Sequence, residues 1–207
     1  AAGQNMVTLA TNVACEYIRQ ETGHKFFLDS NLASDKKASS RNMILGRGHG
    51  VIAETHITKS VMARVLNVDP DFVIENWTYF PIVSAMAGTL GNAIHASNAL
   101  TAMYIATGQD TACVAENSVG HFTVEKVDDG ITWRLTLPSM TVGTVGGGTR
   151  LNQQQQNLQL LGCDSGEYSS RKLAEIIASA ALGLEISLGS AIMSHTWTSA
   201  HMKYGRK

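Results

Sequence analysis

Apolar residues recur along much of the chain at intervals of three and four positions, the spacing that places them on one face of a helix. Residues 92–107 are apolar nearly all round, which indicates a buried helix that Gly108 ends. Gly23 is a similar stop signal after an amphipathic run. The expected helices are residues 4–20, 58–66 with Thr58 as cap, 92–107, 151–161, and a long helix that Ser170 caps and that can continue to about Tyr204.

Other segments alternate between apolar and polar residues, which is typical of strands. Asp128-Asp129-Gly130 lies between two such runs and is a hairpin signal. Residues 29–40 form a long polar loop, and loops of this kind tend to be functional or disordered. The expected strands are residues 25–28, 48–57, 122–127 and 131–137, and a crowded turn is expected over 84–91.

The composition is that of a globular protein. Of the 207 residues, 44% are hydrophobic and 16% charged, and the net charge is −1, so one domain, or one plus part of another, can build a core. The near-zero charge gives no support to nucleic-acid binding or an electrostatic membrane anchor. No run of 18 apolar residues is present, so no membrane span is expected. Cys15, Cys113 and Cys163 lie far apart, which argues against a disulfide framework or zinc site and favours a reducing compartment.

A glycine-rich segment, residues 141–149, is the most informative motif. It contains Gly146, Gly147 and Gly148 in succession. Such a loop can present bare N–H groups to a phosphate, an oxyanion or a cofactor amide. It matches neither the P-loop nor the usual dinucleotide fingerprint, and a tight turn is the alternative interpretation.

Several polar residues are candidates for chemistry. In Asp35-Lys36-Lys37, a cation held by a carboxylate can stabilise an oxyanion, although such triplets are also ordinary solvated charges. Asp110 follows a predicted helix and can cap backbone groups or tune a lysine. His201 can act as a general acid or favour a helix dipole. His95 and Asn98 are three residues apart and either satisfy each other in the core or face a ligand.

Six motifs follow one another along the chain: Asp35-Lys36-Lys37, residues 84–88, residues 92–98, Gly108-Gln109-Asp110, residues 138–149 and Ala200-His201-Met202. Taken in order, they resemble 3-hydroxy-3-methylglutaryl-CoA (HMG-CoA) reductase, in its class I form. Residues 1–6 are also similar to the end of that family's cofactor motif. The resemblance covers essentially the whole chain, and the Asp35-Lys36-Lys37 and 138–149 motifs are the most specific.

This resemblance implies an enzyme of the mevalonate pathway to isoprenoids, which reduces HMG-CoA to mevalonate and CoA with two NADPH. It implies that Lys36 stabilises the oxyanion, that Asp110 hydrogen-bonds Lys36, and that His201 protonates the CoA thiolate. No metal is implied. The substrate-binding positions would be Asp35, Lys37, Asn98, Leu188, Ala191 and Ile192, and the NADPH-binding positions Gly3, Gln4, Asn5, Val145, Gly146, Gly147 and Arg206.

The resemblance also implies the architecture. The fold would be α+β, with residues 1–28 as the C-terminal part of a small ferredoxin-like NADP-binding domain. Residues 29–207 would form a large, helix-rich substrate-binding and catalytic domain, in which loop 29–40 presents Lys36. In the family, active sites form between subunits, so the resemblance implies a dimer or tetramer. The expected location is the cytoplasm, and no nucleic-acid partner and no membrane contact are expected for this segment.

Some positions depart from the family pattern. The family's catalytic glutamate, in a Glu-Asn-Val-Ile-Gly motif, would lie upstream of Ala1, so the chain is expected to be truncated at its N-terminal side. Residues 116–120 look similar to that motif but lie elsewhere in the order, so the role is not transferred to Glu116. Asp29 and Tyr79 stand where the family usually has serine and lysine, and both changes make the expected carboxylate pocket less positive.

Three hypotheses follow from the sequence. The chain is the catalytic region of an HMG-CoA reductase, a non-catalytic homologue that lacks the glutamate, or an unrelated α/β binding domain with a glycine-rich loop. The ordered motifs argue against the third, and an upstream Glu-Asn-Val-Ile-Gly motif would separate the first two. Residues 1–207 alone are expected to have little or no reductase activity.

Overall fold

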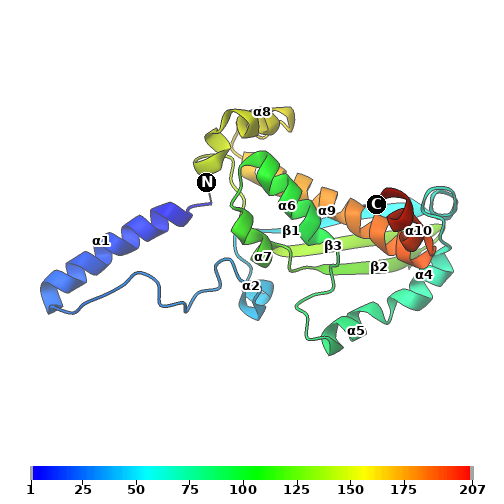
Figure 1. Ribbon diagram of the computed structural model, residues 1–207, viewed down its shortest axis with the longest axis horizontal. Helices are drawn as coiled ribbons and strands as arrows, with labels where there is room; N and C mark the ends of the chain where they lie inside the picture. Colours follow the sequence, from blue (N-terminus) through cyan, green and yellow to red (C-terminus); the bar gives the residue numbers. More distant parts are fainter. Residues whose placement is uncertain (1, 206–207) are drawn as a thin grey trace.

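The computed structural model describes residues 2–205, in which one antiparallel sheet is combined with many helices (Figure 1). The sheet has the strand order β1-β3-β2. The strands are β1 (His49–Thr58), β2 (His121–Val127) and β3 (Gly130–Met140). The helices are α1 (Gln4–Thr22), α2 (Ser40–Leu45), α3 (Lys59–Val61), α4 (Pro70–Trp77), α5 (Phe80–Met86), α6 (Ala96–Thr107), α7 (Val114–Asn117), α8 (Asn152–Leu160), α9 (Ser169–Met193) and α10 (Thr196–Tyr204). Shorter turns are Met62–Leu66, Thr111–Cys113 and Gly147–Arg150.

The sheet confirms the strands predicted from alternation. Along β3, Ile131, Trp133 and Leu135 are fully buried, whereas the residues between them are only half-buried. One face of an antiparallel sheet commonly packs on the core while the other meets solvent. The buried face lies under α9, which contacts both β1 and β3, and α6 packs in turn on α9. The α+β class is therefore confirmed for the described residues.

Helix α9 is the core helix. Its residues that face the sheet and α6 are buried, among them Leu173, Ile177 and Ala181. By length and composition it could also cross a membrane, because an 18-residue window has a mean hydropathy of 1.8. The sequence has no run of 18 apolar residues, and the expectation that no segment spans a membrane stays a prediction. Half of the window is buried inside the protein, and a core helix meets the same criterion.

Several predicted elements differ in the structure. Residues 25–28 form no strand, because they lie away from the sheet and have no strand to pair with (Figure 1). The long C-terminal helix breaks after Met193, where His195 has a positive φ of 59°. Ser170 lies inside α9 rather than capping it. The sequence pattern also missed α2, α4, α5 and α7.

Helix α6 begins four residues later than predicted and is not buried all round. Ile105 is exposed, and only one side of the helix meets the core. The residues that precede α6 form hydrogen bonds outside the helix. The Asn92 side chain accepts the backbone N–H of Phe122 at 2.8 Å and donates to its carbonyl at 2.9 Å. Glu185 accepts the backbone N–H groups at the start of α6. Gly108 ends the helix as predicted, with a φ of 70°.

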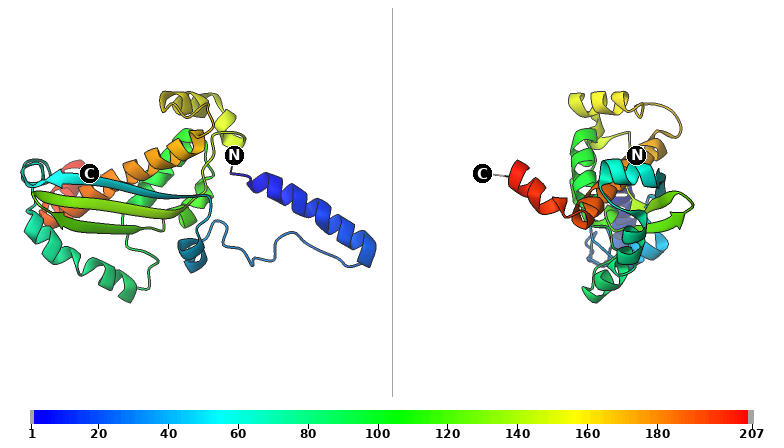
Figure 2. Two further views of the ribbon diagram at one scale, coloured as in Figure 1. Left: turned by 180° about the vertical axis from the view of Figure 1, so that it is seen from behind. Right: turned by 90° about the vertical axis from the view of Figure 1, so that its right-hand side faces the viewer.

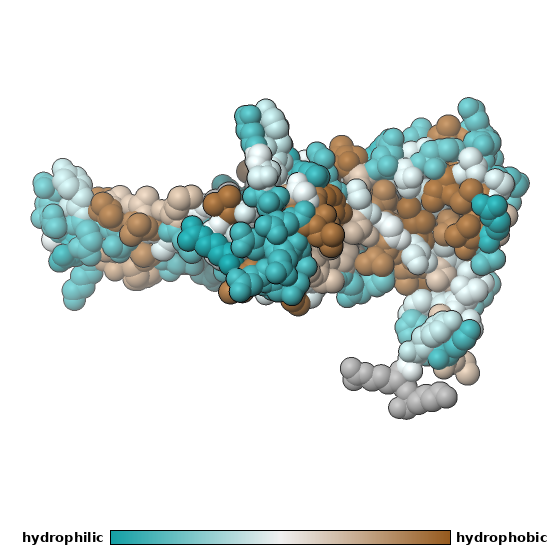
Figure 3. Space-filling view, turned by 90° about the horizontal axis from the view of Figure 1, so that it is seen from above, coloured by the Kyte–Doolittle hydropathy of each residue, from teal (hydrophilic) through white to brown (hydrophobic). Residues whose placement is uncertain are grey.

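Helix α1 confirms the predicted amphipathic helix, and Gly23 ends it in the left-handed conformation. No residue of α1 is buried, and the helix projects away from the sheet in both Figure 1 and Figure 2. Its apolar side chains Met6, Leu9 and Val13 remain exposed. Hydrophobic residues accordingly appear on the surface at the left end of the molecule in Figure 3, where this helix lies. The apolar face of α1 is therefore uncovered within the described residues.

Candidate active site

Lys36 and Asp110 form an ion pair at the end of the sheet near α7. Lys36 Nζ lies 2.9 Å from Asp110 Oδ2. Asp110 Oδ1 accepts the backbone N–H of Ala112 at 3.1 Å, which fixes the carboxylate. The hydrogen bond and charge of Asp110 raise the pKa of Lys36 above its ordinary value, and the same hydrogen bond lowers the pKa of Asp110. Both groups are therefore charged at neutral pH, and the ammonium is held in one place.

The glycine-rich segment borders a pocket of about 600 Å³, which we call the glycine-loop pocket. Gln109 fixes the segment, because its side chain bonds both the carbonyl and the N–H of Gly143, at 2.9 and 2.8 Å. Asp110 also lines the pocket. The other lining residues include Gly3, Gln4, Asn5, Thr141, Val145, Gly146, Gly147 and Gly148.

The three consecutive glycines have two different roles. Gly146 and Gly147 have positive φ values of 88° and 53°, and no atom lies within 4 Å of where their Cβ atoms would be. They therefore leave a bare, open stretch of backbone facing the pocket. A Cβ on Gly148 would come within 2.8 Å of the Gly108 carbonyl oxygen. The loop is thus both a tight backbone contact and a candidate ligand cradle.

We expect Gly108→Ala to destabilise the protein far more than Gly146→Ala. The new Cβ at Gly108 would lie 2.4 Å from the carbonyl carbon and oxygen of Gly148, so backbone must move. A loss of about 2–3 kcal/mol in the free energy of unfolding follows from such overpacking at positive φ, against about 1 kcal/mol at Gly146, where space is free. Urea unfolding of both variants measures this, and equal losses would contradict it.

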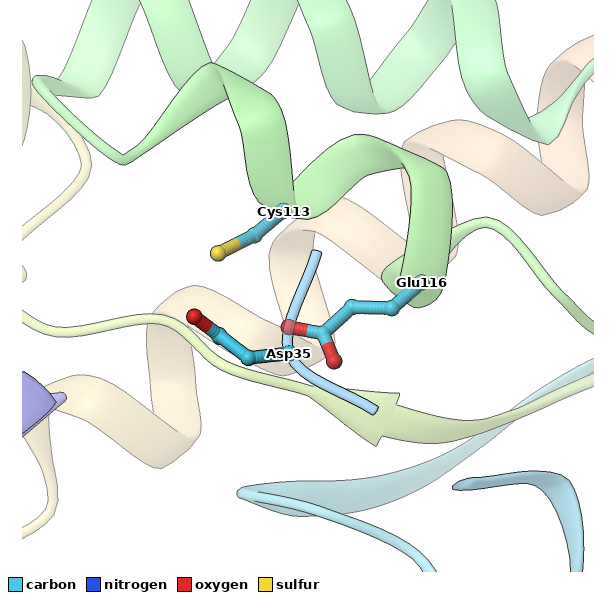
Figure 4. Close-up of side chains that lie close together, drawn as sticks. All are labelled: Asp35, Cys113 and Glu116. Atoms are coloured by element: carbon cyan, nitrogen blue, oxygen red, sulfur yellow. The ribbon is translucent and has the colours of Figure 1, made fainter. Parts of the chain in front are cut away.

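A second charged cluster lies behind Lys36. Asp35, Cys113 and Glu116 point toward one another, with ligand-type atoms within 4.8 Å (Figure 4). Arg47 lies between the two carboxylates: its Nη2 is 2.7 Å from Asp35 Oδ1, and its Nη1 pairs with Glu116 Oε1. Because the guanidinium supplies the positive charge there, we assign no metal ion to this cluster.

The remaining candidate residues lie elsewhere in the chain. His201 is on α10, at the other end of the sheet from α7 in Figures 1 and 2, and its Nδ1 lies 2.9 Å from the Trp197 carbonyl oxygen. Asn98 is exposed in the first turn of α6. Leu188, Ala191 and Ile192 lie on the last turns of α9, half-buried or exposed.

The described chain thus holds two separate groups of candidate residues. Lys36, Asp110, Asp35, Lys37 and the glycine-loop pocket form one group. The candidate residues of α9 and α10, together with Asn98 on α6, form the other, and the chain does not bring His201 to Lys36. Arg206 lies outside the described residues.

Residues 1–206 match the protein family described as hydroxymethylglutaryl-coenzyme A reductase. The chain belongs to this family. A 3-hydroxy-3-methylglutaryl-coenzyme A reductase of Methanocaldococcus jannaschii is 37% identical over 213 residues, which cover all of this chain and 52% of that protein. One of Aeropyrum pernix is 41% identical over 214 residues, covering 51% of its length. A fungal reductase, of Aspergillus terreus, is 40% identical over 219 residues, 21% of its length.

The chain spans about half the length of these archaeal members of the HMG-CoA reductase family. From the sequence, the catalytic role was not transferred to Glu116, and Arg47 was not a candidate. In the structure, Arg47 pairs with both Glu116 and Asp35, the residue before Lys36. The only local signal was an arginine between two glycines, Gly46 and Gly48. Asp29 and Tyr79, the two departures, are both exposed.

Proposed function

We propose that this chain is the substrate-binding and catalytic region of an NADPH-dependent HMG-CoA reductase, which converts HMG-CoA to mevalonate and CoA by two hydride transfers. The observation that carries the proposal is the Lys36–Asp110 ion pair at the glycine-loop pocket. Family membership supports it, since the relatives are named as this reductase. The free state of all three cysteines fits a cytoplasmic location.

Hydride addition to a thioester carbon places negative charge on the carbonyl oxygen. A preorganised cation at that oxygen stabilises the transition state. Lys36 supplies the cation, and Asp110 fixes its position and keeps it protonated. NADPH supplies the hydride when bound. Gly3, Gln4, Asn5, Val145, Gly146 and Gly147 would hold it, because they line one pocket whose glycine backbone is open to a ligand.

The separation of the two residue groups favours a site assembled from two copies of the chain. In this arrangement, His201, Asn98, Leu188, Ala191 and Ile192 of one copy complete the site that contains Lys36 of another. Coexpression of Lys36→Ala and His201→Ala chains tests it. Mixed dimers then hold one intact site of two, and activity returns to about a quarter of wild type. No recovery, with mixed dimers present, would place both residues in a single-chain site.

The exposed apolar face of α1 supports the two-domain proposal. Residues 1–28 would end the small ferredoxin-like NADP-binding domain, and 29–207 would form the large domain. Met6, Val7, Leu9 and Val13 are each more than 60% exposed, and such a contiguous apolar face is typical of a surface that another part of the protein covers.

Asp110→Asn is expected to reduce kcat about 10- to 100-fold and to shift its alkaline limb to lower pH. In the wild type, the pair is complete above the lowered pKa of Asp110 and is lost only as pH rises through the raised pKa of Lys36. Without the carboxylate charge, the pKa of Lys36 falls toward its ordinary value, so Lys36 loses its proton at lower pH. A pH–rate profile measures the shift, and an unmoved limb would contradict it.

The full-length enzyme that contains this region provides the direct test. Oxidation of NADPH that requires HMG-CoA and yields mevalonate and free CoA supports the proposed function. A folded protein without this turnover would instead be the non-catalytic homologue.

A further inference from the structure

We infer that Arg47 and Asn42, held by the buried carboxylate of Glu116, form a frame that positions the loop carrying Lys36. This inference rests on the proposed function, in which Lys36 is the catalytic cation. Glu116 is fully buried on α7, does not line the glycine-loop pocket itself, and has no ion pair with Lys36 among the described residues. Arg47 and Asn42 are therefore positioning residues that act through the loop.

Arg47 and Asn42 bind different oxygens of Glu116, and each also contacts one residue just before Lys36. The Thr141 hydroxyl is a further, longer donor to Glu116 Oε1, at 3.4 Å. Oε1 pairs with Arg47, whose second nitrogen is 2.7 Å from Asp35 Oδ1. Oε2 accepts the Asn42 side-chain amide at 2.8 Å. The same amide nitrogen donates to the Ser34 carbonyl at 3.1 Å. The two positions preceding Lys36 are thus tied to one buried carboxylate.

The loop needs such anchors. Lys36 has a φ of 57°, which a residue with a side chain seldom adopts without support from its surroundings. Its side chain is 44% exposed, and the ion pair that holds it among the described residues is the one with Asp110. Within the loop itself, the backbone contact recorded is Lys37 N–H to the Ser34 carbonyl, at a long 3.3 Å. The frame therefore supplies the anchors that hold this conformation.

The frame also requires an arginine. Asp35 and Glu116 carry like charges close together, and the planar guanidinium lies between them: Nη1 donates to Glu116 Oε1, and Nη2 forms an ion pair with Asp35 Oδ1 at 2.7 Å. A lysine at this position keeps the charge but has one compact ammonium, so it cannot pair with the Asp35 and Glu116 carboxylates through two separate nitrogens. Arg47→Lys and the neutral Asn42→Ala therefore loosen the loop without altering the net charge around Lys36, which faces Asp110, Asp35 and Cys113.

The test measures acetylation of lysines by an N-hydroxysuccinimide ester in the full-length protein, with peptide mass spectrometry. Only the neutral amine reacts, so Lys36, protonated beside Asp110, is modified slowly, and its exposed neighbour Lys37 is an internal reference. In Arg47→Lys and Asn42→Ala, we expect the Lys36-to-Lys37 ratio to rise about threefold or more as the Lys36–Asp110 pair opens. Arg134→Lys, which alters an exposed Arg–Glu pair, is the matched control.

With active enzyme, kcat of Arg47→Lys should fall about tenfold, while KM for HMG-CoA changes little. An unchanged Lys36-to-Lys37 labelling ratio in both variants overturns the inference. If Arg47→Lys does not fold, the ratio in Asn42→Ala alone tests it. A merely structural role would lower the melting temperature without changing the ratio. If the wild type lacks reductase activity but the ratio rises, the proposed function fails and the positioning frame stands.

Discussion

Lys36→Ala in the full-length enzyme should reduce kcat by about a thousandfold or more while leaving the fold intact. The loss of one preorganised donor to a developing oxyanion costs about a hundred- to a thousandfold. Here the donor carries a full charge, so the upper end applies. The melting temperature should change little, because the Lys36–Asp110 pair is partly exposed and such pairs contribute little to stability. Steady-state kinetics and circular dichroism measure the two effects.

Lys59→Ala is the matched control for this variant. It removes another lysine from a Lys–Asp pair, with Nζ 3.2 Å from Asp69, on the exposed surface after β1. Its kcat should equal that of the wild type. A Lys36→Ala enzyme that keeps its rate with an unchanged spectrum would remove Lys36 from the chemistry and leave the frame around it without a function.

The sequence predicted those parts of the fold that depend on local pattern. Strands β1, β2 and β3 alternate because one face of the sheet is buried, and the hairpin at Asp129 follows from its turn residues. The predictions were wrong where contacts between residues far apart in the sequence determine the local structure. The start of α6 depends on Glu185, about 90 positions away, and residues 25–28 have strand composition but no neighbouring strand.

The candidate site divides in the same way. From the sequence, the glycine run was compatible with a turn or a ligand cradle, and the structure assigns Gly148 to close packing and Gly146 and Gly147 to the open side. The proximity of Lys36 to Asp110 was implied only by resemblance, and the geometry now provides it. Glu116 could not be interpreted from sequence, because its meaning depends on Arg47 and Asn42, which lie about 70 residues before it.

Glu185→Ala should be the most destabilising single substitution proposed for this chain. Glu185 is 1% exposed, and its carboxylate accepts three backbone N–H groups, from Ile94 at 3.1 Å and from His95 and Ala96 at 2.7 Å each. These groups open α6, whose N-terminus has no side-chain cap of its own. A carboxylate at a helix N-terminus satisfies both the unpaired donors and the helix dipole.

Alanine would leave those partly buried donors without their acceptor, so the free energy of unfolding should fall by about 3–5 kcal/mol. Glu185→Gln keeps one acceptor oxygen and should cost about 1–2 kcal/mol. Glu175→Ala, an exposed glutamate of the same helix, should change stability by less than about 0.5 kcal/mol. Urea unfolding measures all three variants.

The effect of Glu185 should extend to function, because Asn98 lies in the turn that this carboxylate holds. If Asn98 contacts the substrate, a frayed α6 terminus raises KM for HMG-CoA, and Glu185→Gln, which remains folded, isolates this effect from global unfolding. Hydrogen exchange at Ile94, His95 and Ala96 should then accelerate before that of the rest of α6. Stability and exchange equal to the wild type in Glu185→Ala would mean that α6 is capped by other groups and that its late start has a different cause.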